Sequence, residues 1–293
     1  MQAQVEAERL TQQIRDKARE LLESKAVECV IGYETGTDGV NARPAFIYGP
    51  EGVDRLVFND TCIHNLAKYL LNKKNSSTAV VVKPCDARAV NLLLSERQIN
   101  RDKVSVIGVV CLGVVERQWG AKSEQPQARC QRCATRTPPI YDFLAGEPPA
   151  EEPSRSSYAD VEEMEGKAAA DRQAFWEEHF GHCIRCYACR QVCPGCYCTE
   201  CAAEQLDPEW IGIRIAQPQA TEWNIMRAFH LAGRCIGCSE CERVCPMHIP
   251  LSLVNRKLEK EVLDLFEYRP GMDAEGKAPL ATFEKDESLG IGE

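Results

Sequence analysis

Two copies of one cysteine pattern are the part of this chain with the clearest chemistry. The first copy has the spacing C-x-x-C-x-x-C-x-x-x-C followed by proline, and the second repeats it without change. A 4Fe–4S cube needs four thiolates at its corners, and this tight spacing lets three thiolates of one loop reach three irons of one cube. The two copies are Cys183, Cys186, Cys189 and Cys193 before Pro194, and Cys235, Cys238, Cys241 and Cys245 before Pro246.

The fourth cysteine of each copy is expected to serve the other copy's cluster. This is the ligand run of a bacterial-type two-cluster ferredoxin, in which that cysteine ligates the second cube. Structural zinc also uses C-x-x-C pairs, but it needs only two pairs and leaves the third spaced cysteine and the proline unexplained. The expected ligands are Cys183, Cys186, Cys189 and Cys245 for the first cluster, and Cys235, Cys238, Cys241 and Cys193 for the second.

Four further cysteines form a candidate third site. Cys130 and Cys133 make another C-x-x-C pair, and Cys85 and Cys111 each follow an apolar run that we predict to be a strand. Because the carboxyl ends of parallel strands gather at one edge of a sheet, these thiols are expected to meet there. A third 4Fe–4S cluster, a zinc site and ordinary buried cysteines are all open on spacing alone.

The remaining cysteines carry a weaker signal. Cys196, Cys198 and Cys201 directly follow the first ferredoxin run, and with a distant residue such as Cys62 they could hold a fourth cluster. We favour no ligand role for them. Cys29 lies in a strand-like run and is expected to be part of the core.

Composition limits the classes of function. The chain has 293 residues, a formal net charge of −9 and 17 cysteines, an odd number. The negative charge offers no general electrostatic support for a nucleic-acid partner. The longest nearly apolar run, 104–115, is too short to cross a bilayer, and the polar start of the chain predicts no secretory signal. We therefore expect a cytoplasmic protein of a reducing, anaerobic cell, without direct membrane insertion.

The first half of the chain predicts an α/β fold. A helical apolar stripe covers about residues 4–24, and short β-branched runs alternate with helical patterns after it. Asp86 is expected to be the N-cap of one of these helices. Strand, helix and strand at this spacing predict a βαβ unit with a parallel sheet. The expected strands are 27–33, 44–49, 78–84 and 104–111, and the expected helices are 65–74 and 86–98.

The sequence thus predicts an α/β parallel-sheet domain with a cluster site, followed by a two-cluster ferredoxin domain. A stretch rich in Pro, Glu, Ser and Ala separates the two, and an apolar stripe from Leu251 to Leu265 predicts a closing helix. The expected segments are an amphipathic helix at 1–25, the α/β domain at 26–145, a linker at 146–172, the ferredoxin domain at 173–268 and an acidic extended tail at 269–293.

Two family resemblances bear on the pathway. The segments KPCDARAV, IGVVC and CQRCATRTPPIYDFLAG resemble the beta-subunit family of deazaflavin-coenzyme-reducing hydrogenases and formate dehydrogenases. That resemblance implies that Cys85, Cys111, Cys130 and Cys133 bind a 4Fe–4S cluster. The cysteine-rich half resembles the iron–sulfur subunits of sulfhydrogenases and anaerobic sulfite reductases.

Together these observations predict a non-catalytic iron–sulfur subunit that relays single electrons between redox centres on other subunits of an anaerobic oxidoreductase complex. We expect a complex of the hydrogenase, formate dehydrogenase or disulfide/sulfite reductase type. The alternative is a catalytic subunit that binds FAD in the α/β domain and reduces a soluble carrier, although the chain has no glycine-rich phosphate loop for a flavin. A zinc-scaffolded assembly protein is a third, weaker alternative.

Overall fold

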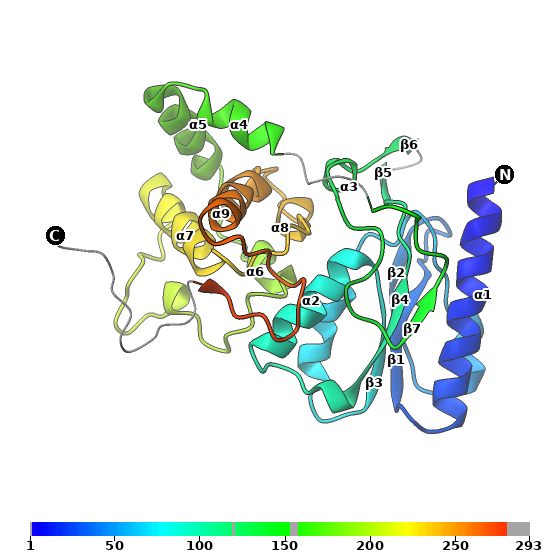
Figure 1. Cartoon of the computed structure of the whole chain (residues 1–293). Coiled ribbons are helices and arrows are strands. Elements are labelled where there is room, and N and C mark those ends of the chain that lie inside the picture. Colours follow the sequence, from blue (N-terminus) through cyan, green and yellow to red (C-terminus); the bar gives the residue numbers. More distant parts are fainter. Residues whose placement is uncertain (1, 119–120, 153–157, 280–293) are drawn as a thin grey trace.

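The computed structural model describes residues 2–118, 121–152 and 158–279. Figure 1 shows two units side by side: an α/β unit that contains the N-terminus, and a helical unit built from the cysteine-rich half.

A five-stranded sheet forms the centre of the α/β unit, with the strand order β2-β1-β3-β4-β7. Its strands β1, β3, β4 and β7 are parallel, and β2 pairs with β1 in the antiparallel sense. The expected parallel sheet is therefore confirmed. The bounds are Cys29–Thr35 for β1, Ala42–Ile47 for β2, Thr78–Val82 for β3, Val104–Val109 for β4 and Phe143–Ala145 for β7.

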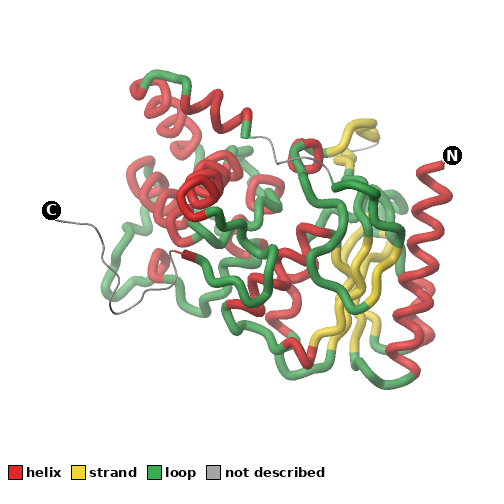
Figure 2. The backbone as a smooth tube through the Cα atoms, in the orientation of Figure 1, coloured by secondary structure: helices red, strands yellow, loops and turns green. Residues whose placement is uncertain are grey.

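Helices cover both faces of the sheet (Figure 2), which is why β3, with the sequence TAVVV, is buried along its whole length. On one face lies α1 (Gln2–Glu23), whose buried stripe includes Leu10, Ile14, Ala18 and Leu22. On the other face lie α2 (Pro84–Ser95) and the 3₁₀ helix η2 (Leu66–Asn72).

The expectation that Asp86 caps α2 is wrong. The helix begins at Pro84, because proline fits the first helical position, and this places Asp86 one turn inside. Its carboxylate instead accepts hydrogen bonds from the backbone N–H of Lys83 at 3.1 Å and from the Lys83 ammonium at 2.8 Å. The pair is fully buried beside Cys85.

Short elements complete the α/β unit. The expected helix at 65–74 is the tighter 3₁₀ helix η2, and two more 3₁₀ turns lie at Pro50–Arg55 and Arg101–Lys103. An antiparallel ribbon of β5 (Val115–Gln118) and β6 (Ala121–Pro126) follows β4 and leads into the short helix α3 (Ala128–Gln131).

The helical unit has a small core of its own. Phe180, Trp223, Ile249 and Leu251 are buried together with Cys189 and Cys241. The Phe180 ring stacks on Trp176. Its elements are α4 (Ala159–Glu165), α5 (Ala169–Gly181), α6 (Ala188–Val192), the 3₁₀ turn η4 (Ala202–Glu204), α7 (Gln217–His230), α8 (Glu240–Arg243) and α9 (Leu251–Phe266).

The two units share a packed boundary. Ile236 and Cys238 of the helical unit belong to the hydrophobic core of the α/β unit. After α9, the chain returns along α2, where the carbonyls of Pro270 and Gly271 accept hydrogen bonds from Arg88 at 2.9 Å and Asn91 at 3.0 Å (Figure 1). Within the described residues, no helix is long and apolar enough to cross a membrane.

Candidate iron–sulfur site

The two ferredoxin runs fold with the same backbone. In each run, the residues on either side of the second cysteine have left-handed φ angles: 52° at Arg185 and 59° at Tyr187 in the first, and 67° at Gly237 and 52° at Ser239 in the second. Successive turns of this kind point backbone N–H groups into a concavity that favours anions, including the sulfur-rich surface of a cluster. The sequence repeat is therefore also a structural repeat.

Each ferredoxin run contributes to a small cavity lined by four thiols. The first ferredoxin cavity has an empty volume of about 330 Å³, and the second has about 350 Å³. The spacing predicts that the fourth cysteine of each run lies in the cavity of the other run. The structure groups the thiols in this way. The first is lined by Cys183, Cys186, Cys189 and Cys245, and the second by Cys193, Cys235, Cys238 and Cys241.

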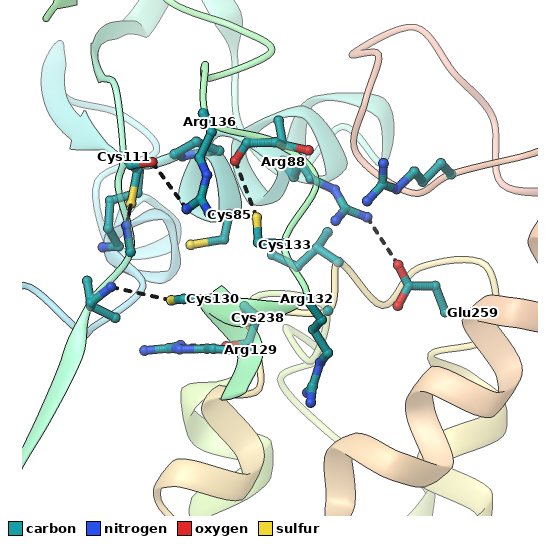
Figure 3. Close-up of a pocket in the computed structure, with 18 of the residues that line it drawn as sticks. Cys85, Arg88, Cys111, Arg129, Cys130, Arg132, Cys133, Arg136, Cys238 and Glu259 are labelled. Carbon is teal, nitrogen blue, oxygen red and sulfur yellow. Dashed lines mark hydrogen bonds and ion pairs between the residues drawn. The ribbon is translucent and has the colours of Figure 1, made fainter. Parts of the chain in front are cut away.

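A third cavity lies between the two units, and we call it the interdomain cavity (Figure 3). Cys85 projects from the first turn of α2 and Cys111 follows β4, so both lie at the carboxyl edge of the parallel sheet. Cys130 lies on α3 and Cys133 just after it. All four thiols line this cavity of about 720 Å³, and Cys238 lines both it and the second ferredoxin cavity.

Several thiol sulfurs already have hydrogen-bond donors. The backbone N–H of Gly113 donates to Cys111 and that of Val114 to Cys130, each at 3.4 Å. In the helical unit, the Asn255 side chain donates to Cys241 at 3.7 Å. Donors of this kind stabilise thiolate ligands and tune the reduction potential of a cluster.

Burial makes several of the cavity-lining thiols reluctant to ionise. It raises the pKa of Cys111 and of Cys241 to about 11, that of Cys189 to about 12, and that of Cys85 well above its usual range. These four thiols are therefore neutral at pH 7 until iron replaces their protons. Cluster assembly at these positions should release protons and should be favoured by higher pH.

The wall of the interdomain cavity is strongly basic. Glu259 is the one carboxylate among its described lining residues. Three of the cationic side chains form ion pairs with carboxylates that do not line the cavity: Lys83 with Asp86, Arg129 with Glu240, and Arg256 with Asp160. Seven cationic side chains line it: Lys83, Arg88, Arg129, Arg132, Arg136, Arg256 and Arg269. Sequence reasoning missed this wall, because its members are scattered along most of the chain and converge only in the fold.

The other cysteines line none of the three thiol cavities. Cys62 is buried in the α/β unit, where it accepts from the Asn59 N–H at 3.4 Å. Cys196 lies instead beside Cys193, whose pKa it lowers to about 5 through a hydrogen bond. Cys198 is exposed, and Cys29 is in the core as expected. Within the described ranges, no three His, Cys, Asp or Glu side chains converge closely enough to hold a single metal ion.

Comparison with known proteins supports an iron–sulfur assignment. Residues 182–250 match the family model of a 4Fe-4S dicluster domain. The F420-dependent formate dehydrogenase subunit beta of Methanocaldococcus jannaschii is 25% identical, in an alignment that covers 86% of this chain and 89% of that protein. The F420-dependent formate dehydrogenase 1 subunit beta of Methanococcus maripaludis is 24% identical, over 89% of this chain and 90% of the relative.

Fold, cysteine sets and comparisons together define a class: this is an iron–sulfur electron-transfer subunit of an oxidoreductase. The matches confirm the predicted resemblance to the beta-subunit family of deazaflavin-linked hydrogenases and formate dehydrogenases. They also confirm the predicted ferredoxin-type second half.

Proposed function

We propose that the chain carries three 4Fe–4S clusters in a row and relays single electrons along them. The first cluster is held by Cys183, Cys186, Cys189 and Cys245, the second by Cys193, Cys235, Cys238 and Cys241, and the third by Cys85, Cys111, Cys130 and Cys133.

One observation carries this proposal: Ile236 and Cys238 line both the second ferredoxin cavity and the interdomain cavity. A cluster in the interdomain cavity would be separated from a cluster in the second ferredoxin cavity by little more than the loop that carries these two residues. The first and second ferredoxin cavities are also neighbours, because the fourth cysteine of each run, Cys193 or Cys245, lines the cavity of the other run. The second cluster therefore lies in the middle of the row, and the first and third lie at its ends.

The donor set fits a cluster chemically. Thiolates are the ligands that iron–sulfur clusters use, and each cavity offers at least four thiols. When bound, the clusters supply reversible one-electron chemistry. The chain's own residues hold the thiols in place, donate N–H groups to their sulfurs and exclude water from the buried ones.

The two ends of the row face different surroundings. Cys186, at the first ferredoxin cavity, is exposed, and so are the neighbouring apolar side chains of Ile184 and Met247, at 46% and 37%. This end suits another subunit of a redox complex. By analogy with the relatives, we propose a formate dehydrogenase-type complex with a formate-oxidising partner.

A second function is favoured by the size of the interdomain cavity. Its volume is about twice that of either ferredoxin cavity, and its basic wall suits an anionic carrier or the phosphates of a flavin. The chain would then also bind FAD there and reduce a soluble carrier, and the relatives' dependence on a deazaflavin supports that class of carrier. A flavin absorbance band in the anaerobically purified protein is the expected sign. If that band is absent, the electron relay is the only proposed function that remains.

Metal analysis after anaerobic reconstitution tests the relay. The full chain should bind about twelve irons with matching acid-labile sulfide, four per cube. Cys130→Ser should lose about four of them and keep the electron paramagnetic resonance (EPR) signals of the ferredoxin pair. Cys62→Ser, a buried cysteine of the same unit outside the three sets, is the matched control and should keep all of them. Stoichiometric zinc in place of iron, or unchanged iron in Cys130→Ser, would contradict the proposal.

A further inference from the structure

Two deeply buried arginines have no carboxylate partner among the described residues. Four arginines are 7% exposed or less. Two of the four form ion pairs: Arg88 with Glu259 at 3.6 Å, and Arg256 with Asp160 at 2.9 Å. Within the described part of the chain, Arg185 and Arg227 pair with no carboxylate. Because a guanidinium keeps its charge when it is buried, an unpaired one is costly unless something anionic lies beside it.

Arg227 lies on α7 and lines the second ferredoxin cavity. Its Nη2 donates to the carbonyl of Cys189 at 3.0 Å, and the thiol of Cys189 lines the first ferredoxin cavity. Its Nε is buried without a hydrogen-bond partner. The guanidinium therefore lies at the second cavity and also contacts the loop that forms the first.

Arg185 belongs to the loop of the first ferredoxin run and is the one charged side chain among the described lining residues of the first ferredoxin cavity. Its Nη1 donates to the carbonyl of Gly212 at 2.7 Å and its Nη2 to the hydroxyl of Tyr187 at 3.1 Å. Its Nε is buried without a partner. The ring of Trp223, with its centroid 5.9 Å from the guanidinium carbon, attracts the cation but supplies no counter-charge.

The two arginines are not copies of each other in the repeat. Gly237 stands in the second run where Arg185 stands in the first. Arg227 lies eight residues before the first cysteine of its run, and Phe175 has the corresponding place before the other run. Each cavity thus receives one unpaired arginine from a different position of the repeat. What the two positions share is their place beside four thiols, not their local sequence.

The other charged side chains at the second ferredoxin cavity are paired. Arg234 forms an ion pair with Glu96, and Glu240 forms one with Arg129. The charge of Arg227 is therefore the uncompensated one among the described lining residues of this cavity. A cluster with four thiolate ligands is an anion, and reduction adds one more negative charge, so a nearby cation stabilises the reduced form most.

We propose that Arg185 and Arg227 are counter-charges for the two ferredoxin clusters, which stabilise the reduced form of each cluster and raise its reduction potential. The inference rests on the proposed function, since it requires a cluster in each ferredoxin cavity. In the step concerned, a cluster gains one electron, no bond forms or breaks, and each guanidinium keeps its proton. Both arginines act through charge and ligate no iron.

Redox titration of the full-length, anaerobically reconstituted protein with dithionite, followed by EPR, tests the inference. Cys130→Ser and Cys186→Ser identify the signals of the third and first clusters by their loss. Arg185→Gln, which keeps an N–H donor but removes the charge, should shift the first cluster's signal to lower potential. Arg227→Gln should lower the potentials of both ferredoxin signals, because its guanidinium lines the second cavity and contacts the loop of the first.

Two kinds of control separate charge from structure. Arg185→Lys and Arg227→Lys keep the charge but not the planar set of donors, so their potentials should stay close to those of the wild type. A purely structural role would make the lysine and glutamine variants alike. Arg43→Gln removes an arginine that is 52% exposed on β2, and it should move no potential.

Each outcome decides a different point. Full iron content with an unmoved potential in a glutamine variant overturns the inference for that arginine and leaves the relay standing, and so do equal shifts in its lysine and glutamine variants. If a glutamine variant fails to assemble its clusters, the lysine variant decides: wild-type potentials support the counter-charge, whereas lowered potentials or failed assembly overturn it. A wild-type protein without iron in the ferredoxin cavities overturns the relay and the inference together.

Discussion

The guanidinium of Arg129 donates to the carboxylate of Glu240 at 2.8 Å, and this contact joins the helix that carries Cys130 to the helix that carries Cys241. The two side chains are 8% and 1% exposed. Arg129 also donates to the carbonyl of Cys238 and, at 2.8 Å, to that of Ile63. One arginine thus ties the interdomain cavity, the second ferredoxin loop and the α/β unit together.

Loss of this contact should destabilise the boundary between the units. Glu240→Gln leaves the Arg129 charge buried without its counter-charge, and breaking a buried pair costs about 3–5 kcal/mol. Thermal or denaturant unfolding under anaerobic conditions measures the loss. As a control, Glu6→Gln breaks the exposed pair with Arg9 and should cost about 1 kcal/mol or less. Equal effects of the two variants would contradict the role given to Glu240.

The same carboxylate gives a prediction on pH. Burial alone would raise the pKa of Glu240, but hydrogen bonds and charges from Arg243 and Arg129 outweigh it and lower the pKa below its usual range. A group with a lowered folded pKa stabilises the fold above its unfolded pKa, and that contribution disappears as the pH falls through the folded value. The stability gap between wild type and Glu240→Gln should therefore be widest near pH 7 and should narrow in acid.

His64 should contribute the opposite kind of pH dependence. Burial lowers its pKa to about 4, helped by the positive charge of Arg243, whose Nη2 lies 3.3 Å from the ring Nδ1. The unfolded chain takes up a proton near pH 6.5 while the folded chain does not, so the histidine destabilises the fold increasingly as the pH falls from about 6.5 to about 4. His64→Asn should flatten the stability curve in that window. A slope identical to that of the wild type would argue against a neutral, buried His64.

Local sequence patterns were enough to predict how the thiols are grouped. The C-x-x-C-x-x-C spacing fixes one loop, and the repeat at 235–245 folds with the same left-handed positions as 183–193. Cys85 and Cys111 were placed correctly at one sheet edge, because each follows a strand of the same parallel sheet. Their role as cluster ligands remains a prediction that iron analysis decides.

The features that depend on the packing of the two units could not be predicted. Cys238 faces two cavities only because the second ferredoxin loop packs into the α/β core. Arg88 and Glu259 lie on helices far apart in the chain, and nothing in their local sequences marks them as a pair. Asp86 was misplaced because a proline two residues earlier starts the helix, and a cap preference cannot override that geometry.

The cysteines that follow the first ferredoxin run should prove dispensable for iron. Cys198 and Cys201 line none of the three thiol cavities, and the carbonyl of Cys198 accepts from Arg190 at 2.8 Å. We expect Cys198→Ser to keep the full iron content. The matched control is Cys186→Ser, which changes another exposed cysteine, one that lines the first ferredoxin cavity, and it should lose iron. If Cys198→Ser lost about four irons, a further cluster would have to be considered.

Gly271 should be the most sensitive position of the segment that runs back along α2. Its φ is 74°, and a Cβ built there would lie 2.2 Å from the carbonyl oxygen of Arg88. Gly271→Ala therefore adds both backbone strain, of about 1–2 kcal/mol, and a clash with helix backbone that cannot move aside. The segment should detach from α2 and break the Asn91 and Arg88 hydrogen bonds to residues 270 and 271.

Limited proteolysis measures this detachment, because cleavage within 267–279 should become faster in Gly271→Ala than in the wild type. Gly276→Ala is the control: a Cβ built there would meet its nearest atoms at 3.5 Å or beyond, so the substitution is accommodated and cleavage should stay slow. Unchanged cleavage in Gly271→Ala would show that residues 270 and 271 do not hold this segment in place.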